Sequence, residues 1–193
     1  MGKRLALIVS VALITAGCAS GASTATTAPA ATVTDAGAQT MTLQVISTAF
    51  ASGKTIPVKY TCDGQKVSVP LTWGEPPANA SSFALIVDDP DAPGRTYVHW
   101  VLYNIPSSSR GLPEGVLATA TLPDGSRNGK NSAGQSGYMG PCPPSGTHRY
   151  YFKLYALDTM LQLAPGANKE QLLAAMKDHI VAQGELMGTY SRS

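Results

Sequence analysis

The amino-acid sequence predicts a mainly β domain, a sandwich or a barrel, over residues 41–193. Two observations carry this prediction: short runs rich in β-branched and aromatic residues recur along this part of the chain, and Gly and Pro separate them. Each run is long enough for one short strand. The expected strands cover residues 42–46, 56–61, 83–87, 97–105 and 149–157.

One segment near the C-terminus predicts a helix instead. Asn168 is a good N-cap, Gln171 follows three residues later as in a capping box, apolar residues recur at helical spacing, and Gly184 can end the helix. We expect this helix, which includes His179, to pack against a sheet. A last run, residues 185–190, is expected to return as an edge strand.

The first residues predict export. Lys3 and Arg4 precede an apolar run over residues 5–16, which is shorter than the roughly 20 residues that a helix needs to cross a bilayer. We therefore interpret residues 1–17 as a signal peptide that is removed. The chain is expected to act outside the cytoplasm.

Cys18 follows two small residues, Ala16 and Gly17, as in a bacterial lipoprotein box, although that box usually has Leu where Thr15 stands. We expect lipid on Cys18 to anchor the protein to the cell membrane on its extracytoplasmic side; ordinary cleavage near Ala19 is the alternative. The rest of the segment 18–40 is dominated by Ala, Thr, Ser and Gly and predicts a flexible tether.

The charge balance bears on the binding partners of the protein, and the cysteine count bears on its disulfide bonds. The chain has 14 basic and 12 acidic residues, so loss of Lys3 and Arg4 leaves 12 of each and no net charge. Nothing in this balance suggests a nucleic-acid partner. With Cys18 lipidated, Cys62 and Cys142 remain as one possible disulfide; two separate buried thiols are the alternative.

Candidate ligand-binding residues gather first after the predicted strand 83–87. Asp88 is expected to accept backbone hydrogen bonds in the turn, whereas Asp89 and Asp91 are candidates for a site. Alternation along the next strand places Tyr97, His99, Val101 and Tyr103 on one face.

A second group follows the rigid loop 140–147, which contains Pro143 and Pro144. His148 and Tyr150 then open the apolar face of strand 149–157. Polar residues at these strand ends predict a compact pocket for a small anion. A carboxylate beside an imidazole is expected to favour the imidazolium form, which donates to an anion, and Tyr150 adds a neutral donor.

Enzyme activity is not expected. The segment 134–138 lacks the final Gly of a nucleophile elbow, because Tyr138 stands there. Two histidines and Asp89 could in principle hold zinc, but catalytic zinc usually has three protein ligands in suitable geometry, so we expect neither a metal nor another cofactor.

These motifs resemble those of the phosphatidylethanolamine-binding protein family, including its bacterial Raf-kinase-inhibitor-like branch. The resemblance spans residues 41–190 and rests on Asp-Pro-Asp-Ala-Pro at 89–93, His-Trp-Val-Leu-Tyr-Asn-Ile-Pro at 99–106, and Gly-Pro-x-Pro-Pro-x-Gly running into His-Arg-Tyr at 140–150. It implies a sandwich of two antiparallel sheets with one or two peripheral C-terminal helices, and an anion-accepting cavity at one end.

The resemblance also implies a set of pocket residues: Asp89, Asp91, Tyr97, His99, Pro143, Pro144, His148 and Tyr150. Trp73 is a further candidate for its flank. The implied function is binding of a phosphoryl headgroup or a similar small anion. The alternative is a protein-interaction module that acts like the kinase or protease inhibitors associated with the family.

Overall fold

The computed structural model describes residues 41–192, and the predicted signal peptide, lipidated Cys18 and tether lie outside this range. Within the described residues no helix is long and apolar enough to cross a bilayer. Two sheets and one α-helix make up the regular structure, so the prediction of a mainly β fold is confirmed.

The larger sheet has six strands in the order β1-β9-β8-β4-β5-β7. All its pairs are antiparallel except β1 with β9. Its strands are β1 (Met41–Thr42), β4 (Ser82–Asp89), β5 (Tyr97–Pro106), β7 (Arg127–Asn128), β8 (Thr147–Leu157) and β9 (Ile180–Ser191).

The smaller sheet packs against one face of the larger sheet. It contains β2 (Val45–Ile46), β3 (Leu71–Trp73) and β6 (Gly111–Leu112) in the order β2-β3-β6. The predicted strand 42–46 is therefore divided between the two sheets. Between the sheets lies the main apolar core, to which β4 contributes Phe83, Leu85 and Val87.

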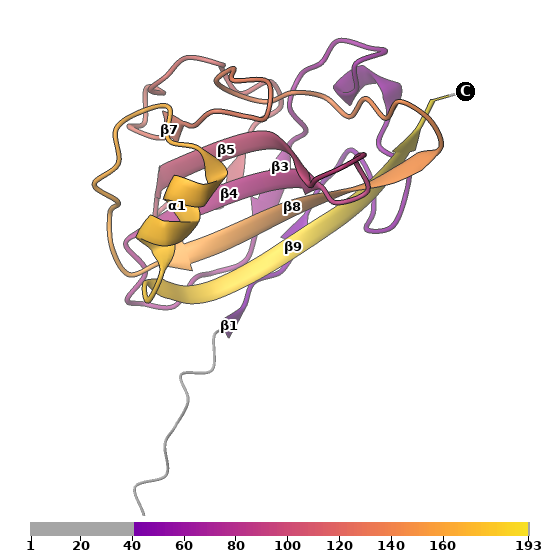
Figure 1. The fold of residues 1–193 in the computed structure, drawn as a ribbon. Coiled ribbons are helices and arrows are strands. Elements are labelled where there is room, and N and C mark those ends of the chain that lie inside the picture. Colours follow the sequence, from indigo (N-terminus) through magenta and orange to yellow (C-terminus); the bar gives the residue numbers. More distant parts are fainter. Residues whose placement is uncertain (1–40, 193) are drawn as a thin grey trace, which may run out of the picture. The chain divides into compact units, whose positions relative to one another are not determined.

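Helix α1 (Lys169–Met176) covers the opposite face of the larger sheet (Figure 1). Its capping box has the predicted form, because Asn168 accepts from the backbone of Gln171 while the Gln171 side chain accepts from the backbone of Asn168. Leu172 and Met176 are fully buried against Ala84 and Ile86 of β4. Both faces of β4 are thus buried, which explains why its sequence is an almost continuous apolar run.

Three predicted elements need correction. Residues 56–61 do not form a strand: Ile56 bonds to Thr189, but Pro57 has no N–H to continue a ladder and a 3₁₀-helix (Val58–Tyr60) follows. The α-helix stops at Met176 rather than at Gly184, because Lys177 is extended and Asp178 has a left-handed φ of 66°.

The same early stop gives β9 its length. β9 begins at Ile180 and runs to Ser191, so the strand predicted at 185–190 is longer than expected; β1 pairs with β9 only at Ala182 and Gln183. His179 precedes β9 outside the helix, with its Nδ1 2.8 Å from Oδ1 of Asp158.

Candidate functional site

A β-bulge in β5 sets the orientation of His99. Val87 of β4 pairs with Trp100 and the next residue, Asp88, pairs with Val98, so His99 is an extra residue in the ladder. Trp100 packs in the core between the sheets, while Val98 packs on the α1 side. Simple alternation was therefore wrong in placing Val101 and Tyr103 on the face of His99, because both lie in the α1-side cluster.

The predicted site residues lie around a cavity of about 550 Å³, within the size range of small-molecule sites. Four of them, Asp89, Tyr97, His99 and Pro144, line it. The remaining lining residues, which the sequence analysis did not assign to it, are Cys62, Lys66, Ala92, Pro93, Gln135, Met139, Gly140 and Cys142.

Asp89 is held by two hydrogen bonds at the end of β4. Its Oδ2 lies 2.7 Å from Nδ1 of His148, and its Oδ1 accepts from the backbone N–H of Asp91 at 2.8 Å. The side chains of Asp89 and His148 are only 4% and 9% exposed. His148 is thus a neighbour of the cavity that fixes Asp89 rather than one of the lining residues.

His99 is oriented by a backbone carbonyl. Its Nδ1 lies 2.8 Å from the oxygen of Met139, and because a carbonyl only accepts, Nδ1 carries a proton. The ring centroid lies 5.2 Å from those of both Tyr97 and Tyr150. The hydrogen bond to Met139 uses Nδ1, so Nε2 is the ring nitrogen left to meet a ligand.

The charge state of His99 differs from our expectation. Burial lowers the pKa of His99 below its ordinary value, and this outweighs the opposing effects of the Met139 carbonyl and the Asp89 carboxylate. The expected preference for imidazolium was therefore wrong for His99. At neutral pH its Nε2 presents a lone pair.

Tyr150 carries a buried hydroxyl near the cavity, although the residue is not part of the lining. Within the described part of the chain this OH makes no hydrogen bond of good geometry, while the Asp89 carboxylate lies close enough to affect it. Burial raises the pKa of Tyr150, and the neighbouring Asp89 raises it further, so the hydroxyl keeps its proton. A buried donor without a well-aligned acceptor is costly, which makes this hydroxyl a candidate to donate to a ligand.

Asp91 and Pro143 are near the cavity but are not among its lining residues. Asp91 accepts hydrogen bonds from Nε of Arg149 at 2.9 Å, from Nη2 of Arg149 at 2.6 Å and from the backbone N–H of Arg149 at 2.9 Å. These bonds hold the pKa of the Asp91 carboxyl at about 2. Its partner in this structure is therefore Arg149.

Asp88 and Trp73 have structural roles. Asp88 is fully buried at the end of β4, with Lys153 Nζ at 2.9 Å and Lys169 Nζ at 2.5 Å, so the predicted turn role was wrong. Trp73 packs on Phe83 in the core and donates to the carbonyl of Ser109, away from the cavity. No group of three or more potential metal-ligating side chains is found in residues 41–192.

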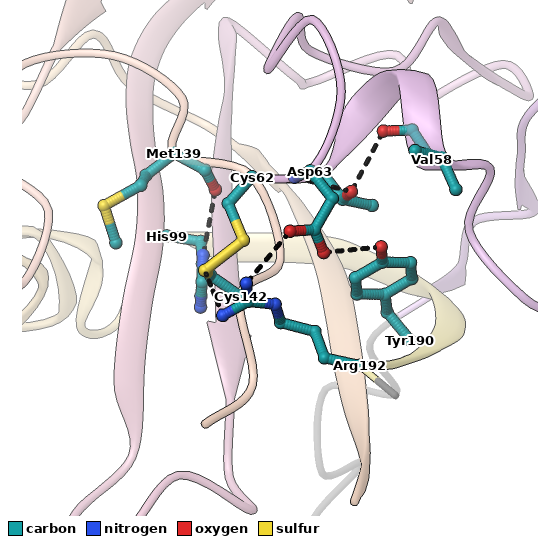
Figure 2. The surroundings of a disulfide bond; sticks show 9 residues. Val58, Cys62, Asp63, His99, Met139, Cys142, Tyr190 and Arg192 are labelled. Carbon is teal, nitrogen blue, oxygen red and sulfur yellow. Dashed lines mark hydrogen bonds and ion pairs between the residues drawn. A yellow bond between two sulfur atoms is a disulfide. The ribbon is translucent and has the colours of Figure 1, made fainter. Parts of the chain in front are cut away.

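One wall of the cavity contains a disulfide between Cys62 and Cys142, shown in Figure 2 with His99 and Met139 beside it. The backbone N–H of Cys62 also donates to the carbonyl of Pro141 at 3.0 Å. Of the two alternatives that the sequence left open, the structure has the disulfide. The pairing of Cys62 with Cys142 could have predicted from the sequence that residues near Cys62, including Lys66, lie close to the Pro-rich loop.

The C-terminal end of β9 is attached to the same wall. The hydroxyl of Tyr190 donates to Oδ2 of Asp63 at 2.8 Å, and Arg192 forms an ion pair with Asp63 at 3.1 Å (Figure 2). Tyr190, which the sequence left unassigned, therefore supports the loop that carries Cys62.

Comparisons with known proteins agree with this architecture. Residues 46–191 match the family model described as phosphatidylethanolamine-binding protein. A UPF0098 protein of Methanothermobacter thermautotrophicus is 54% identical over 144 residues, which cover 75% of this chain and 95% of that protein. A UPF0098 protein of Chlamydia muridarum is 45% identical over 155 residues, 78% of this chain and 99% of that protein.

Two solved structures share the fold. The structure of a phosphatidylethanolamine-binding protein homologue of Chlamydia trachomatis has a TM-score of 0.72 at 43% identity and covers 79% of this chain and 99% of its own. YbcL of E. coli, described as a new member of the mammalian family, has a TM-score of 0.72 at 31% identity and covers 78% of this chain and 99% of its own.

Proposed function

Because the chain belongs to the phosphatidylethanolamine-binding protein family, we propose that its cavity binds a small anion, in particular a phosphoryl group. The observation that carries this proposal is the cavity lined by His99, with the buried hydroxyl of Tyr150 behind the His99 ring. A phosphoryl oxygen would give this hydroxyl a well-aligned acceptor. A second hydrogen bond would join the ligand to Nε2 of His99. Its proton comes either from a protonated phosphoryl oxygen or from Nε2 itself, once Nε2 has taken up a proton.

We propose binding rather than catalysis, since the described lining of the cavity has no hydroxyl or free thiol of the kind that most hydrolases use as a nucleophile. Its lining includes no serine or threonine, and both of its cysteines are joined in the disulfide. The carboxylate of Asp89 is already engaged by His148 and by the backbone of Asp91. The groups that remain are donors and acceptors suited to holding a ligand.

Calorimetric titration with inorganic phosphate tests the proposal, with His99→Phe as the site variant. Phenylalanine keeps the aromatic packing with Tyr97 and Tyr150 but removes Nε2. A hydrogen bond to a charged group contributes about 1.5–3 kcal/mol, so His99→Phe should weaken binding by about tenfold or more.

The matched control is His179→Phe, which changes a partly exposed histidine outside the cavity and should bind as the unaltered protein does. If the unaltered protein binds neither phosphate nor phosphorylethanolamine, the anion-binding proposal fails. The protein-interaction role would then be the function to pursue.

We further propose that the protein is exported and held at the cell membrane by lipid on Cys18. The support is the signal-like segment 1–17 together with the disulfide, because disulfides persist mainly in oxidising compartments. Expression with a radiolabelled fatty acid should label the protein and place it in the membrane fraction. Cys18→Ser should remove the label; labelling that survives this change would contradict the proposal.

A further inference from the structure

Lys66 is the only lysine or arginine among the described residues that line the cavity. Its side chain is exposed, and it forms no ion pair with any residue in the range 41–192. We propose that Lys66 supplies the positive charge that holds the anion in the cavity. This inference rests on the function proposed above and identifies the residue that makes the site selective for charge.

No other group in the described lining of the cavity supplies a positive charge at neutral pH. Asp89 brings a negative charge to the cavity, although His148 engages one of its oxygens. His99 uses its Nδ1 proton for the carbonyl of Met139, and at neutral pH its Nε2 presents a lone pair. An anion that enters would meet the carboxylate of Asp89 and, at neutral pH, no positive charge on His99, so a nearby ammonium is needed.

The backbone fixes Lys66 beside the cavity while its side chain stays unengaged. Lys66 has a left-handed φ of 60°, and its N–H donates to the carbonyl of Lys59 at 3.1 Å. Four residues earlier, Cys62 is joined to Cys142 on the neighbouring loop. The loop that carries Lys66 is therefore tied to the Pro-rich loop a few residues away from Lys66.

The left-handed conformation adds to the argument. It is uncommon for a residue with a long side chain, and Gly or Asn adopts it at lower cost. Residues kept in such conformations concentrate at functional sites. A lysine at this position is explained if its ammonium group has a task in the cavity.

Phosphate affinity at pH 7 and low ionic strength tests the role of Lys66. Lys66→Gln removes the charge at similar length, and an exposed ion pair of this kind predicts a threefold to fivefold weaker affinity, on the order measured for surface pairs. Lys66→Arg keeps the charge and should stay within about twofold of the unaltered protein. Added salt should weaken binding more in the unaltered protein than in Lys66→Gln, because salt screens this pair.

Lys54→Gln is the control for net charge, because Lys54 is also exposed but does not line the cavity. It should leave the affinity unchanged. If Lys66→Gln binds phosphate as tightly as the unaltered protein, or no more weakly than Lys54→Gln, the inference is wrong while the anion site stands. If the unaltered protein binds no phosphate, the proposed function fails and the inference fails with it.

Discussion

Removal of the disulfide between Cys62 and Cys142 should lower the free energy of unfolding substantially. The two cysteines are 80 residues apart, and a loop of this length reduces the entropy of the unfolded chain enough to contribute about 4 kcal/mol. The native loops should stay together after the bond is lost. The backbone N–H at position 62 still donates to the carbonyl of Pro141, and the hydroxyl of Tyr138 still donates to the carbonyl of Tyr60.

Urea denaturation of the oxidised protein and of a Cys62→Ala, Cys142→Ala double variant measures this effect. With a urea slope of about 2 kcal/mol per molar, the midpoint should fall by about 2 M. The slope itself should rise, because the unfolded chain without the bond exposes more surface. A loss below about 1 kcal/mol with an unchanged slope would mean that the bond hardly restricts the unfolded chain, contrary to this expectation.

Three further predictions follow from the site and its supports. Phosphate affinity should fall as the pH rises through the lowered pKa of His99, because the anion favours imidazolium, which is populated below that pKa; titrations from pH 5 to 8 that show constant affinity would contradict this. The Asp91 carboxyl, with a pKa of about 2, should stay ionised at pH values well below the ordinary pKa of 3.8. Its pair with Arg149 therefore stabilises the fold above about pH 4, and this stabilisation is lost as the pH falls from about 4 to 2. An ordinary titration midpoint for the carboxyl carbon in NMR would disprove the pairing. Gly140→Ala should destabilise the fold by about 1–3 kcal/mol in urea, because an added Cβ would lie 2.8 Å from a backbone carbonyl oxygen, whereas Gly74→Ala, with open space, should change it little; equal effects would refute the steric argument.

The large strands were predictable because their side chains carry a strong signal. β4 and β8 contain the predicted strands 83–87 and 149–157, because buried β-branched and aromatic residues fill these runs. β4 is longer than predicted by one residue at its start and two at its end, and β8 by two residues at its start. The short strands β3, β6 and β7 have two or three residues each, too few for any periodic pattern. Their positions depend on pairing with distant strands.

The site was predictable in its residue types but not in its geometry. Motif position brought together Asp89 and His148, but a bulge at His99 reversed the alternation on which the face assignment of β5 depended. Asp88 and Asp89 are adjacent in sequence, yet β4 directs one toward Lys169 under α1 and the other toward the cavity. Alternation along β4 puts these two side chains on opposite faces, and the sheet register, with β4 between β5 and β8, determines what each face meets.

Lys66 shows a different limit of sequence reasoning. It lies about 20 residues before Asp89, in a turn with no motif of its own, and the cavity gains it only because the disulfide and the backbone of Pro141 hold that turn in place. Long-range pairing of this kind is invisible to periodicity. The effect of burial on His99 was equally hidden, because it depends on the packed Tyr97 and Tyr150 rings.

Chemical-shift mapping by NMR during addition of inorganic phosphate shows whether the cavity binds an anion. Saturable shifts should concentrate at His99 and Lys66, which line the cavity, and at Tyr150, which packs on His99, and should be absent from Lys54 and His179. If phosphate causes no saturable shifts, or if the shifts concentrate away from the cavity, the anion-binding account is contradicted.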